Sequence, residues 1–492
     1  MLLGLDLGTT NVKALLLGPD GAVHGRGSCA VKTYSVPGGG IEQDIDEIWT
    51  AALSAVEAAG QSAPLSDVEA VGVSSQGGAM QLLDGDGKPI GRVISWLDGR
   101  SATYNQKITE ECGERWLMRH IGHGRCGLVV GQLARLGKED RTLFIPPNQV
   151  GFVGDIIVGR LCGRRAHDAT SLSIAELLNP ELGEPDPETL ARIGIRASQL
   201  PDLLSVREPA GALRQEVADE LGLPARIPVS VAVHDQYAAA LGCGAVRPGE
   251  VMFGAGTAWV LLTTVREGKL TRGPATPRAY FTPHVVEGAY GQMLSMGNGG
   301  SAIGWASNVL GMDGLSPEGI DDVMESAPPG CEGVQFVPLL ATHRPAGLET
   351  DIDGMFTGLQ LHHEGRHLLR AVGEGLVMEL VRHLGIFLEA ELPLDRLVAC
   401  GGGAASRLIP RLLADTAGVG VSCVTEPDVS AVGAAVIALG LIETGADLPS
   451  LADRLSPDTR AYAPGKGRDF CSKLYEDYLA LLRRTERARR MP

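Results

Sequence analysis

The stretch LLGLDLGTTNVKALLL (Leu2–Leu17) places one charged residue, Asp6, inside an otherwise apolar run and follows it with Gly8-Thr9-Thr10. The apolar residues on both sides predict two strands, and the residues between them predict a tight turn. A carboxylate without a partner is costly inside an apolar strand, so Asp6 needs a cation or several hydrogen-bond donors. A Mg²⁺ ion held through water beside a nucleotide phosphate is one solution. The other is an aspartate at a strand end that accepts bonds from the N–H groups of its own turn.

The order strand, Gly-Thr turn, strand appears again in EVMFGAGTAWVLLTT (Glu250–Thr264). Here Gly256-Thr257 forms the turn, and Gly254 stands where the first stretch has its aspartate. Such a repeat predicts two lobes of like topology. Both turns can donate N–H and hydroxyl bonds, so we expect them to bind phosphate rather than to be plain β-turns. Lys13, in the second strand, either reaches a phosphate or is a surface lysine.

The composition favours a large α/β protein. A chain of 492 residues exceeds one ordinary core, which agrees with two lobes. Its 66 glycines and 4% aromatic residues favour many tight strand-to-helix turns over an all-β sandwich. The net charge of -16 argues against a nucleic-acid or anionic-membrane partner, so a bound phosphate has to be held by local donors.

Cysteine usage and the chain start predict a cytoplasmic protein. The nine cysteines are scattered without a C-x-x-C pair, which is typical of reduced thiols in a cytosolic enzyme. The first residues lack the basic stretch and small-residue cleavage site of a signal peptide. No segment has the run of apolar residues that spans a bilayer, so we also expect no membrane association.

Hydrophobic periodicity predicts the elements around the turns. DIDEIWTAALSAVEAAG (44–60) predicts a helix capped by Asp44 or Asp46, and VEAVGVSS (68–75) predicts a buried strand that ends at Gln76-Gly77-Gly78. We expect four further features: a long helix at 367–390, a strand, turn and helix at 396–418, a strand and Ala-rich helix at 422–445, and a charged, solvated terminal helix at 475–490.

Asp235 follows an apolar strand (Val229–Val233) and precedes a helix of small residues. Open α/β sheets place ligand-contacting groups at such strand ends. An aspartate there can accept the proton of a substrate hydroxyl that attacks a phosphorus atom. The alternative is a helix N-cap, because Asp before QYAAALG is a good cap.

The run CGGGAAS (Cys400–Ser406) sets three glycines between a strand and a helix. It matches neither the Rossmann G-x-G-x-x-G nor the P-loop motif. Three glycines favour close approach of the backbone to a flat ring or a phosphate, whereas a tight turn alone requires fewer.

Two histidine groups, His120 with His123 and His362-His363 with His367, have spacings that a metal ion could use. No cysteine or carboxylate cluster accompanies them in a recognised ligand pattern, so we expect solvated surface histidines.

Eight motifs in order resemble the FGGY carbohydrate kinases, and within them the xylulokinases, over nearly the whole chain. They are DLGTT (6–10), GIEQDIDEIW (40–49), ISWLDGR (94–100), VHDQYAAALGCGAVRPG (233–249), GAGTA (254–258), GNGGSAIGW (297–305), CGGGAASRL (400–408) and SAVGAAVIA (430–438). The resemblance implies two ribonuclease-H-like lobes of the actin and hexokinase type with a cleft between them, an N-terminal lobe at 1–242 and a C-terminal lobe at 243–492. It also implies ATP and Mg²⁺ as cofactors, a small sugar or polyol as substrate, and a homodimer, since the family often forms dimers.

The resemblance assigns roles by position. Asp235 would be the proton acceptor and Asp6 the Mg²⁺-associated carboxylate, and both would be catalytic. The ATP-binding residues would be Gly8, Thr9, Thr10, Lys13, Gly256, Thr257, Gly401, Gly402, Gly403 and Ala404, of which the last four would contact adenosine. The substrate would meet Gln76, Gly77, Gly78, Trp96, Asp98, His234, Asp235 and Gln236.

Departures from the xylulokinase pattern fall where the sugar should bind. Gly77-Gly78 stands where Met-His is typical, so the pocket should lose an imidazole and a thioether and gain room. Gln236 replaces the usual Asn, and ATHRP (341–345) replaces Gly-Glu-Arg-x-Pro. We therefore predict phosphorylation of a ketose such as xylulose, or of a related pentulose, hexulose or polyol. The alternative is a sugar- or nucleotide-binding regulatory protein that has lost the reaction.

Overall fold

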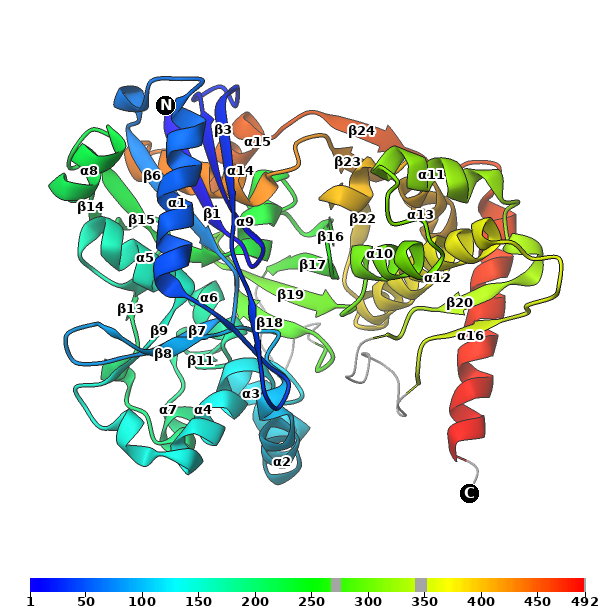
Figure 1. Ribbon diagram of the computed structural model, residues 1–492, viewed down its shortest axis with the longest axis horizontal. Coiled ribbons are helices and arrows are strands. Elements are labelled where there is room, and N and C mark those ends of the chain that lie inside the picture. Colours follow the sequence, from blue (N-terminus) through cyan, green and yellow to red (C-terminus); the bar gives the residue numbers. More distant parts are fainter. Residues whose placement is uncertain (267–275, 341–351, 491–492) are drawn as a thin grey trace. The chain divides into compact units, whose positions relative to one another are not determined.

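The computed structural model describes residues 1–266, 276–340 and 352–490 of the chain, which forms two compact units (Figure 1). Unit 1 comprises Met1–Val246, Thr264–Gln292 and Asp428–Ser456; unit 2 comprises Arg247–Thr263, Met293–Pro427 and Pro457–Pro492. The chain thus returns to unit 1 twice after its first long segment. The lobe boundary at 242/243 stays a prediction.

Unit 1 is built on a sheet with the order β13-β10-β15-β6-β1-β2-β3. The predicted first hairpin is confirmed: β1 (Leu2–Leu7) pairs antiparallel with β2 (Asn11–Leu17), which pairs with β3 (Val23–Ala30). β1 also pairs parallel with β6 (Ala70–Ser75), and β6 pairs parallel with β15 (Pro228–His234). The carboxyl ends of β1, β6 and β15 therefore meet at one edge of the sheet.

The remaining elements of unit 1 include further strands of this sheet, strands of other sheets, and helices. Its other strands are β4 (Tyr34–Val36), β5 (Gly40–Gln43), β7 (Met80–Leu83), β8 (Pro89–Ile94), β9 (Gln149–Phe152), β10 (Ala166–His167), β11 (Leu178–Asn179), β12 (Glu184–Pro185), β13 (Asp202–Leu203), β14 (Gly211–Ala212), β18 (Tyr280–Pro283) and most of β19 (Ala289–Ser295). Its helices are α1 (Ile45–Gly60), α2 (Ala102–Cys112), α3 (Glu114–Ile121), α4 (Leu128–Glu139), α5 (Val153–Cys162), α6 (Ala169–Ile174), α7 (Pro187–Ile193), α8 (Gln215–Leu221), α9 (Asp235–Gly242), α14 (Val429–Ile442) and α15 (Leu448–Leu455).

Two helices of unit 1 show how the sequence determines local structure, α1 through its N-terminal cap and α14 through its contact with a glycine. Of the two candidate caps of α1, Asp44 is the one that acts: its side chain accepts bonds from the N–H groups of Asp46 and Glu47. α14 (orange in Figure 1) lies directly on β1 and β6. A Cβ atom added at Gly72 of β6 would lie 1.8 Å from the carbonyl oxygen of Ala434, so only glycine permits this close approach.

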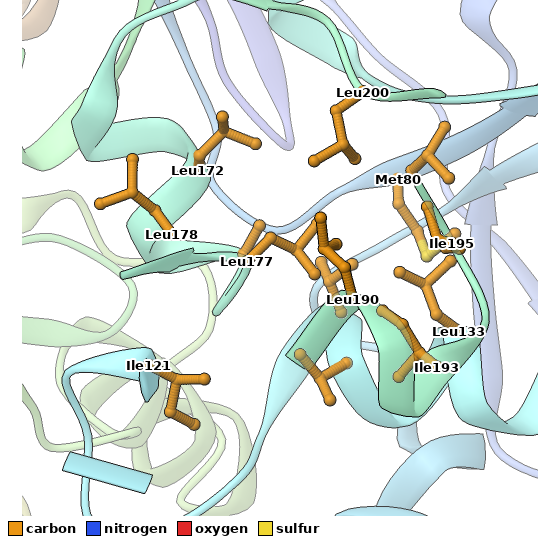
Figure 2. Packing of buried hydrophobic residues seen from close by; sticks show 14 of the residues in the cluster. Met80, Ile121, Leu133, Leu172, Leu177, Leu178, Leu190, Ile193, Ile195 and Leu200 are labelled. Atoms are coloured by element: carbon orange, nitrogen blue, oxygen red, sulfur yellow. The ribbon is translucent and has the colours of Figure 1, made fainter. Parts of the chain in front are cut away.

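A second core of unit 1 lies around the five-stranded sheet β4-β5-β8-β7-β9. Figure 2 shows Met80 of β7 and Leu133 of α4 packed with apolar side chains from the segment 172–200. All of these side chains are less than one tenth exposed. Their burial anchors the loops that follow β6 and β8, where several predicted site residues lie.

Unit 2 repeats the pairing pattern of unit 1. β16 (Gly249–Ala255) pairs antiparallel with β17 (Trp259–Arg266) and parallel with β22 (Leu394–Cys400), as β1 pairs with β2 and β6. In this correspondence Gly254 occupies the place of Asp6, so the internal repeat predicted from the sequence is confirmed. β23 (Val421–Val424) and β24 (Thr459–Tyr462) continue the sheet. β18 and β19 pair on the other edge of this sheet, which contains β16 and β17.

The other elements of unit 2 are mostly helical. They are α10 (Gly300–Val309), α11 (Pro317–Ser326), β20 (Gln335–Val337), β21 (Met355–Thr357), α12 (Gly365–Glu389), α13 (Ile409–Ala417) and α16 (Arg468–Arg490). The prediction of a solvated terminal helix is wrong for α16, because Tyr478, Leu481 and Leu482 are buried. The Tyr478 hydroxyl donates a 2.8 Å hydrogen bond to Glu379 of α12, which fixes one face of the charged helix.

The histidine prediction also needs correction. His123 is 4% exposed and stacks on Tyr280, and His367 is 3% exposed and accepts a bond from the N–H of Glu364. These two are buried structural residues rather than solvated ones. Among the helices that the structure describes, none is both long and apolar enough to cross a membrane.

Candidate active site

The carboxyl ends of β1, β6 and β15 bring together the predicted site residues of unit 1. Asp6 is the register partner of Ser74, and Ser75, one residue further, is that of His234. Gln76-Gly77-Gly78 and Asp235-Gln236 follow directly. Residues more than 200 positions apart in the sequence therefore share one edge of the sheet.

Asp6 is a partly buried carboxylate, and few hydrogen-bond donors offset the loss of its hydration. Ser74 Oγ donates a 2.9 Å hydrogen bond to its Oδ1, and no other hydrogen bond to this side chain occurs in the described part of the chain. Desolvation and the negative charge of Asp235 raise the pKa of Asp6 to about 7, against smaller opposing effects of Ser74 and Lys13. The alternative in which Asp6 accepts bonds from its own turn is therefore wrong. A carboxylate short of positive charge fits a hydrated Mg²⁺ ion.

Asp235 is the first residue of α9, and His234 occupies the N-cap position without a capping side-chain bond. The alternative role of Asp235 as the N-cap is therefore wrong, since the helix begins one residue earlier than that role requires. Its side chain is 26% exposed. Desolvation raises the pKa of Asp235 to about 6, although hydrogen bonds with Gln236 partly oppose the rise. A base whose pKa is near working pH suits general-base catalysis.

The first Gly-Thr turn is tied to the predicted substrate residues. Thr9 Oγ1 donates a 3.0 Å bond to Gln76 Oε1 and accepts a 2.9 Å bond from Trp96 Nε1. Gln43 Nε2 donates to the Thr9 carbonyl, and Gln76 Nε2 donates to Gln43 Oε1. The Thr9 hydroxyl hydrogen is thus engaged within the protein, and the N–H groups of the turn and the hydroxyl of Thr10, which is exposed, are its remaining donors for phosphate. Gln43 is not among the predicted site residues, although it lies in the segment GIEQDIDEIW. A polar amide at the end of a strand is the sequence feature that indicates it.

Lys13 is not an isolated surface lysine. Its Nζ lies 2.9 Å from Asp428 Oδ1, and Arg26 forms an ion pair with the other oxygen of the same carboxylate. Lys13 is also the register partner of Asp6 across the hairpin. The structure therefore places one cation between two carboxylates, next to the turn proposed for phosphate.

The Asp98 carboxylate is saturated by donors from the protein. Arg100, the N–H of Ile41 and Gln132 all donate to it at 2.6–3.0 Å. Burial raises the pKa of Asp98, but these bonds outweigh burial and hold it below its usual value. Asp98 thus orders the loop after β8, in which Trp96 is 39% exposed.

The predicted extra room at Gly77 is absent. A Cβ atom at Gly77 would lie 2.2 Å from Cδ2 and 2.4 Å from Nε2 of His234. The imidazole of His234 fills the space that a side chain at position 77 would need. At Gly78 a Cβ atom would meet Leu128 and Trp96 only at 3.5–3.7 Å, so room remains there.

In unit 2 the second Gly-Thr turn lies against the glycine run. A Cβ atom at Gly401, whose φ is +83°, would lie 3.2 Å from the backbone of Ala255, and one at Gly403 would lie 2.8 Å from Ala255 Cβ. The N–H of Gly300, at the start of α10, donates to the Gly256 carbonyl at 3.0 Å. The structure thus brings Gly256, Thr257 and Gly401–Ala404 together. The segment ATHRP (341–345) lies outside the described residues.

Comparisons with known proteins match two long segments of the chain. Residues 1–242 match the N-terminal domain of the FGGY family of carbohydrate kinases, and residues 251–440 match its C-terminal domain. The chain belongs to the FGGY family of carbohydrate kinases. It is accordingly an ATP-dependent carbohydrate kinase, and the predicted fold class of two α/β lobes is confirmed.

Named relatives of this FGGY kinase differ in substrate. It is 27% identical to a xylulose kinase of Escherichia coli (98% of this chain, 100% of the relative) and 25% identical to a gluconokinase of Bacillus subtilis (90% and 88%). It is 30% identical to a glycerol kinase of Gloeobacter violaceus (89% and 87%). The crystal structure of xylulose kinase from Rhodospirillum rubrum superposes with a TM-score of 0.85 at 25% identity, covering 97% of each chain.

Proposed function

We propose that this FGGY kinase transfers the γ-phosphoryl group of ATP to a hydroxyl of a small ketose or polyol, with Asp235 as proton acceptor. The observation that carries the proposal is the position of Asp235, partly buried at the end of β15 with a raised pKa and close enough to Asp6 to affect its ionisation. An ionised Asp235 accepts the hydroxyl proton as the oxygen attacks phosphorus.

The other residues hold the reactants. The N–H groups of Gly8–Thr10 and Gly256-Thr257 donate to phosphate oxygens, Lys13 supplies charge, and the bare backbone of Gly401–Ala404 admits the adenosine. Asp6 holds a hydrated Mg²⁺ ion, which when bound supplies positive charge to the phosphates. Each of these roles is supported by the clustering of the residues within its own unit.

The acceptor remains a class rather than one sugar. Relatives named for xylulose, gluconate and glycerol have similar identities. Sugar recognition depends on placed polar groups, and this chain has its own set in Gln76, Trp96 and Gln236. A cytoplasmic location and a homodimer stay predictions.

The experiment that tests the proposal measures ADP release from Mg-ATP with a panel of pentuloses, hexuloses, aldonates and polyols. A kinase gives ADP only when an accepted sugar is present, and mass spectrometry then shows the phosphorylated acceptor. A binding protein that has lost the reaction shows sugar affinity in calorimetry without sugar-dependent ADP. That second outcome would overturn the proposal.

A further inference from the structure

We propose that His234 is a positioning residue for the Asp235 carboxylate, and that Gly77 is required because any side chain there would displace the His234 ring. The inference rests on the proposed function, since it takes Asp235 as the proton acceptor. It adds a pair of residues that act together: Gly77, two residues after the end of β6, and His234, the last residue of the neighbouring strand β15.

The first argument is steric. Gly77 has no φ in the left-handed region, so its backbone does not demand glycine, whereas Gly78 has a φ of +72°. The main obstacle to a side chain at Gly77 is the His234 ring, because its Cδ2–Nε2 edge lies only 2.2–2.4 Å from the point that a Cβ atom would occupy, whereas the next atom, Cγ2 of Ile174, lies 2.9 Å from it. Real Cβ atoms do not approach other atoms so closely, so the ring and a side chain at position 77 exclude each other.

The second argument concerns how firmly the ring is held. His234 is 5% exposed, and its backbone N–H donates a 3.2 Å hydrogen bond to Thr170 Oγ1. Thr170 in turn donates to Asp168 at 2.8 Å. The ring meets that of Tyr237 edge-on, with centroids 5.9 Å apart. A ring fixed by backbone and neighbours in this way can orient a partner without a large entropy cost.

The third argument is the polar edge that the ring presents. Nε2 of His234 lies 3.4 Å from Oδ1 of Asp235. Nδ1 is buried and has no hydrogen-bond partner in the described part of the chain. Burial lowers the pKa of His234 to about 4, so the ring is neutral and carries one N–H. Placing that hydrogen on Nε2 puts the donor on the ring edge nearest the carboxylate, because Nδ1 faces no acceptor. The 3.4 Å separation is longer than a normal hydrogen bond, and a small movement of either side chain closes it.

The chemical consequence is a carboxylate with one oxygen held. When the Nε2–H of His234 closes to a hydrogen bond with Oδ1, rotation of the Asp235 side chain is restricted, and the other oxygen is left to accept the hydroxyl proton. Positioning of this kind acts on the turnover step more than on binding, since it sets the geometry of proton transfer.

The first test separates the ring from its nitrogen. His234→Phe keeps the ring volume and removes Nε2, and His234→Gln returns an N–H at a similar distance along the side chain. We expect Phe to lower kcat about tenfold, with KM values for acceptor and ATP changed less than about threefold, and Gln to keep kcat within about threefold of the unsubstituted enzyme. A Phe variant with full kcat, or a Gln variant no better than Phe, would overturn the positioning role.

The second test measures the coupling to Gly77 in a double-mutant cycle. Gly77→Ala should lower kcat about tenfold and lower the melting temperature, because the ring must move. In the His234→Ala background the same change should cost less than about threefold in kcat and clearly less melting temperature, because only the looser contact with Ile174 remains. Additive effects in both readouts would overturn the coupling.

The two proposals fail in different ways. If the unsubstituted protein gives no sugar-dependent ADP with any acceptor, the proposed function fails and the positioning role fails with it. The melting-temperature cycle is independent of turnover, and it then decides alone whether His234 excludes a side chain at Gly77. If the protein is an active kinase and the cycles are additive, only the inference fails.

Discussion

Ser74 Oγ donates a 2.9 Å hydrogen bond to Oδ1 of Asp6 across the parallel strands β1 and β6. Ser74 is fully buried, so its hydroxyl has no competing water. This bond opposes the desolvation that raises the pKa of Asp6 to about 7. The pair therefore sets how much of the Asp6 side chain is ionised near neutral pH.

Replacing Ser74 tests this relationship. Ser74→Ala removes a bond that stabilises the ionised form, so the pKa of Asp6 rises further and the acid limb of kcat/KM for Mg-ATP shifts to higher pH. Ser230→Ala is a matched control, because Ser230 is also fully buried in this sheet but accepts from Val73 instead. An acid limb that moves equally in both variants, or in neither, would contradict this role of Ser74.

Asp6→Asn tests the assignment of the metal carboxylate. Asn keeps the size and the bond from Ser74 but removes the negative charge that attracts a cation. The Mg²⁺ concentration for half-maximal rate at fixed ATP should rise by about tenfold or more. A Mg²⁺ dependence that does not change would remove Asp6 from this role.

Lys13 and Arg26 provide a matched pair for the phosphate contact, because both form ion pairs with Asp428. Only Lys13 lies opposite Asp6 in the hairpin. We expect Lys13→Met to raise KM for ATP roughly tenfold, as for loss of a charged hydrogen bond, and Arg26→Met to change it less than about twofold. Equal effects of the two substitutions on KM would show that Lys13 serves the fold and not ATP.

The close packing of α14 on β6 predicts a large loss of stability. Gly72→Ala would place Cβ at 1.8 Å from the Ala434 carbonyl oxygen and should cost about 3 kcal/mol or more of unfolding free energy. Gly385→Ala in α12 meets nothing within 4 Å, and it should stabilise the helix by about 0.5–1 kcal/mol. Urea unfolding followed by circular dichroism measures both; similar midpoints would contradict the packing described here.

Much of the fold follows from local pattern. The two hairpins were predictable because each is an apolar strand, a glycine turn and a second apolar strand, and the contrast of Asp6 with Gly254 was visible in the same alignment. The packing of α14 against β1 and β6 was not predictable. The helix is apolar on nearly all faces, so its periodicity indicates burial without indicating a partner more than 350 residues away.

The site was predictable where a polar residue interrupts an apolar pattern, as at Asp6 and Asp235. Contacts between side chains from different strands were not, and these decide whether a group is available. Asp98 is occupied by Arg100 and Gln132, and the Thr9 hydroxyl by Gln76. Gly77 was the clearest error: an absent side chain in the sequence predicts space, but the ring that fills it comes from β15.

The proposed reaction depends above all on Asp235 accepting the proton of the acceptor hydroxyl. This role is tested by kcat of Asp235→Asn with the best acceptor of the panel, together with the affinity for ATP measured by calorimetry. Loss of a general base predicts a fall in kcat of roughly 10²–10⁴-fold with ATP affinity within about threefold of the unsubstituted enzyme. A kcat of Asp235→Asn within about tenfold of that enzyme would show that Asp235 is not the base.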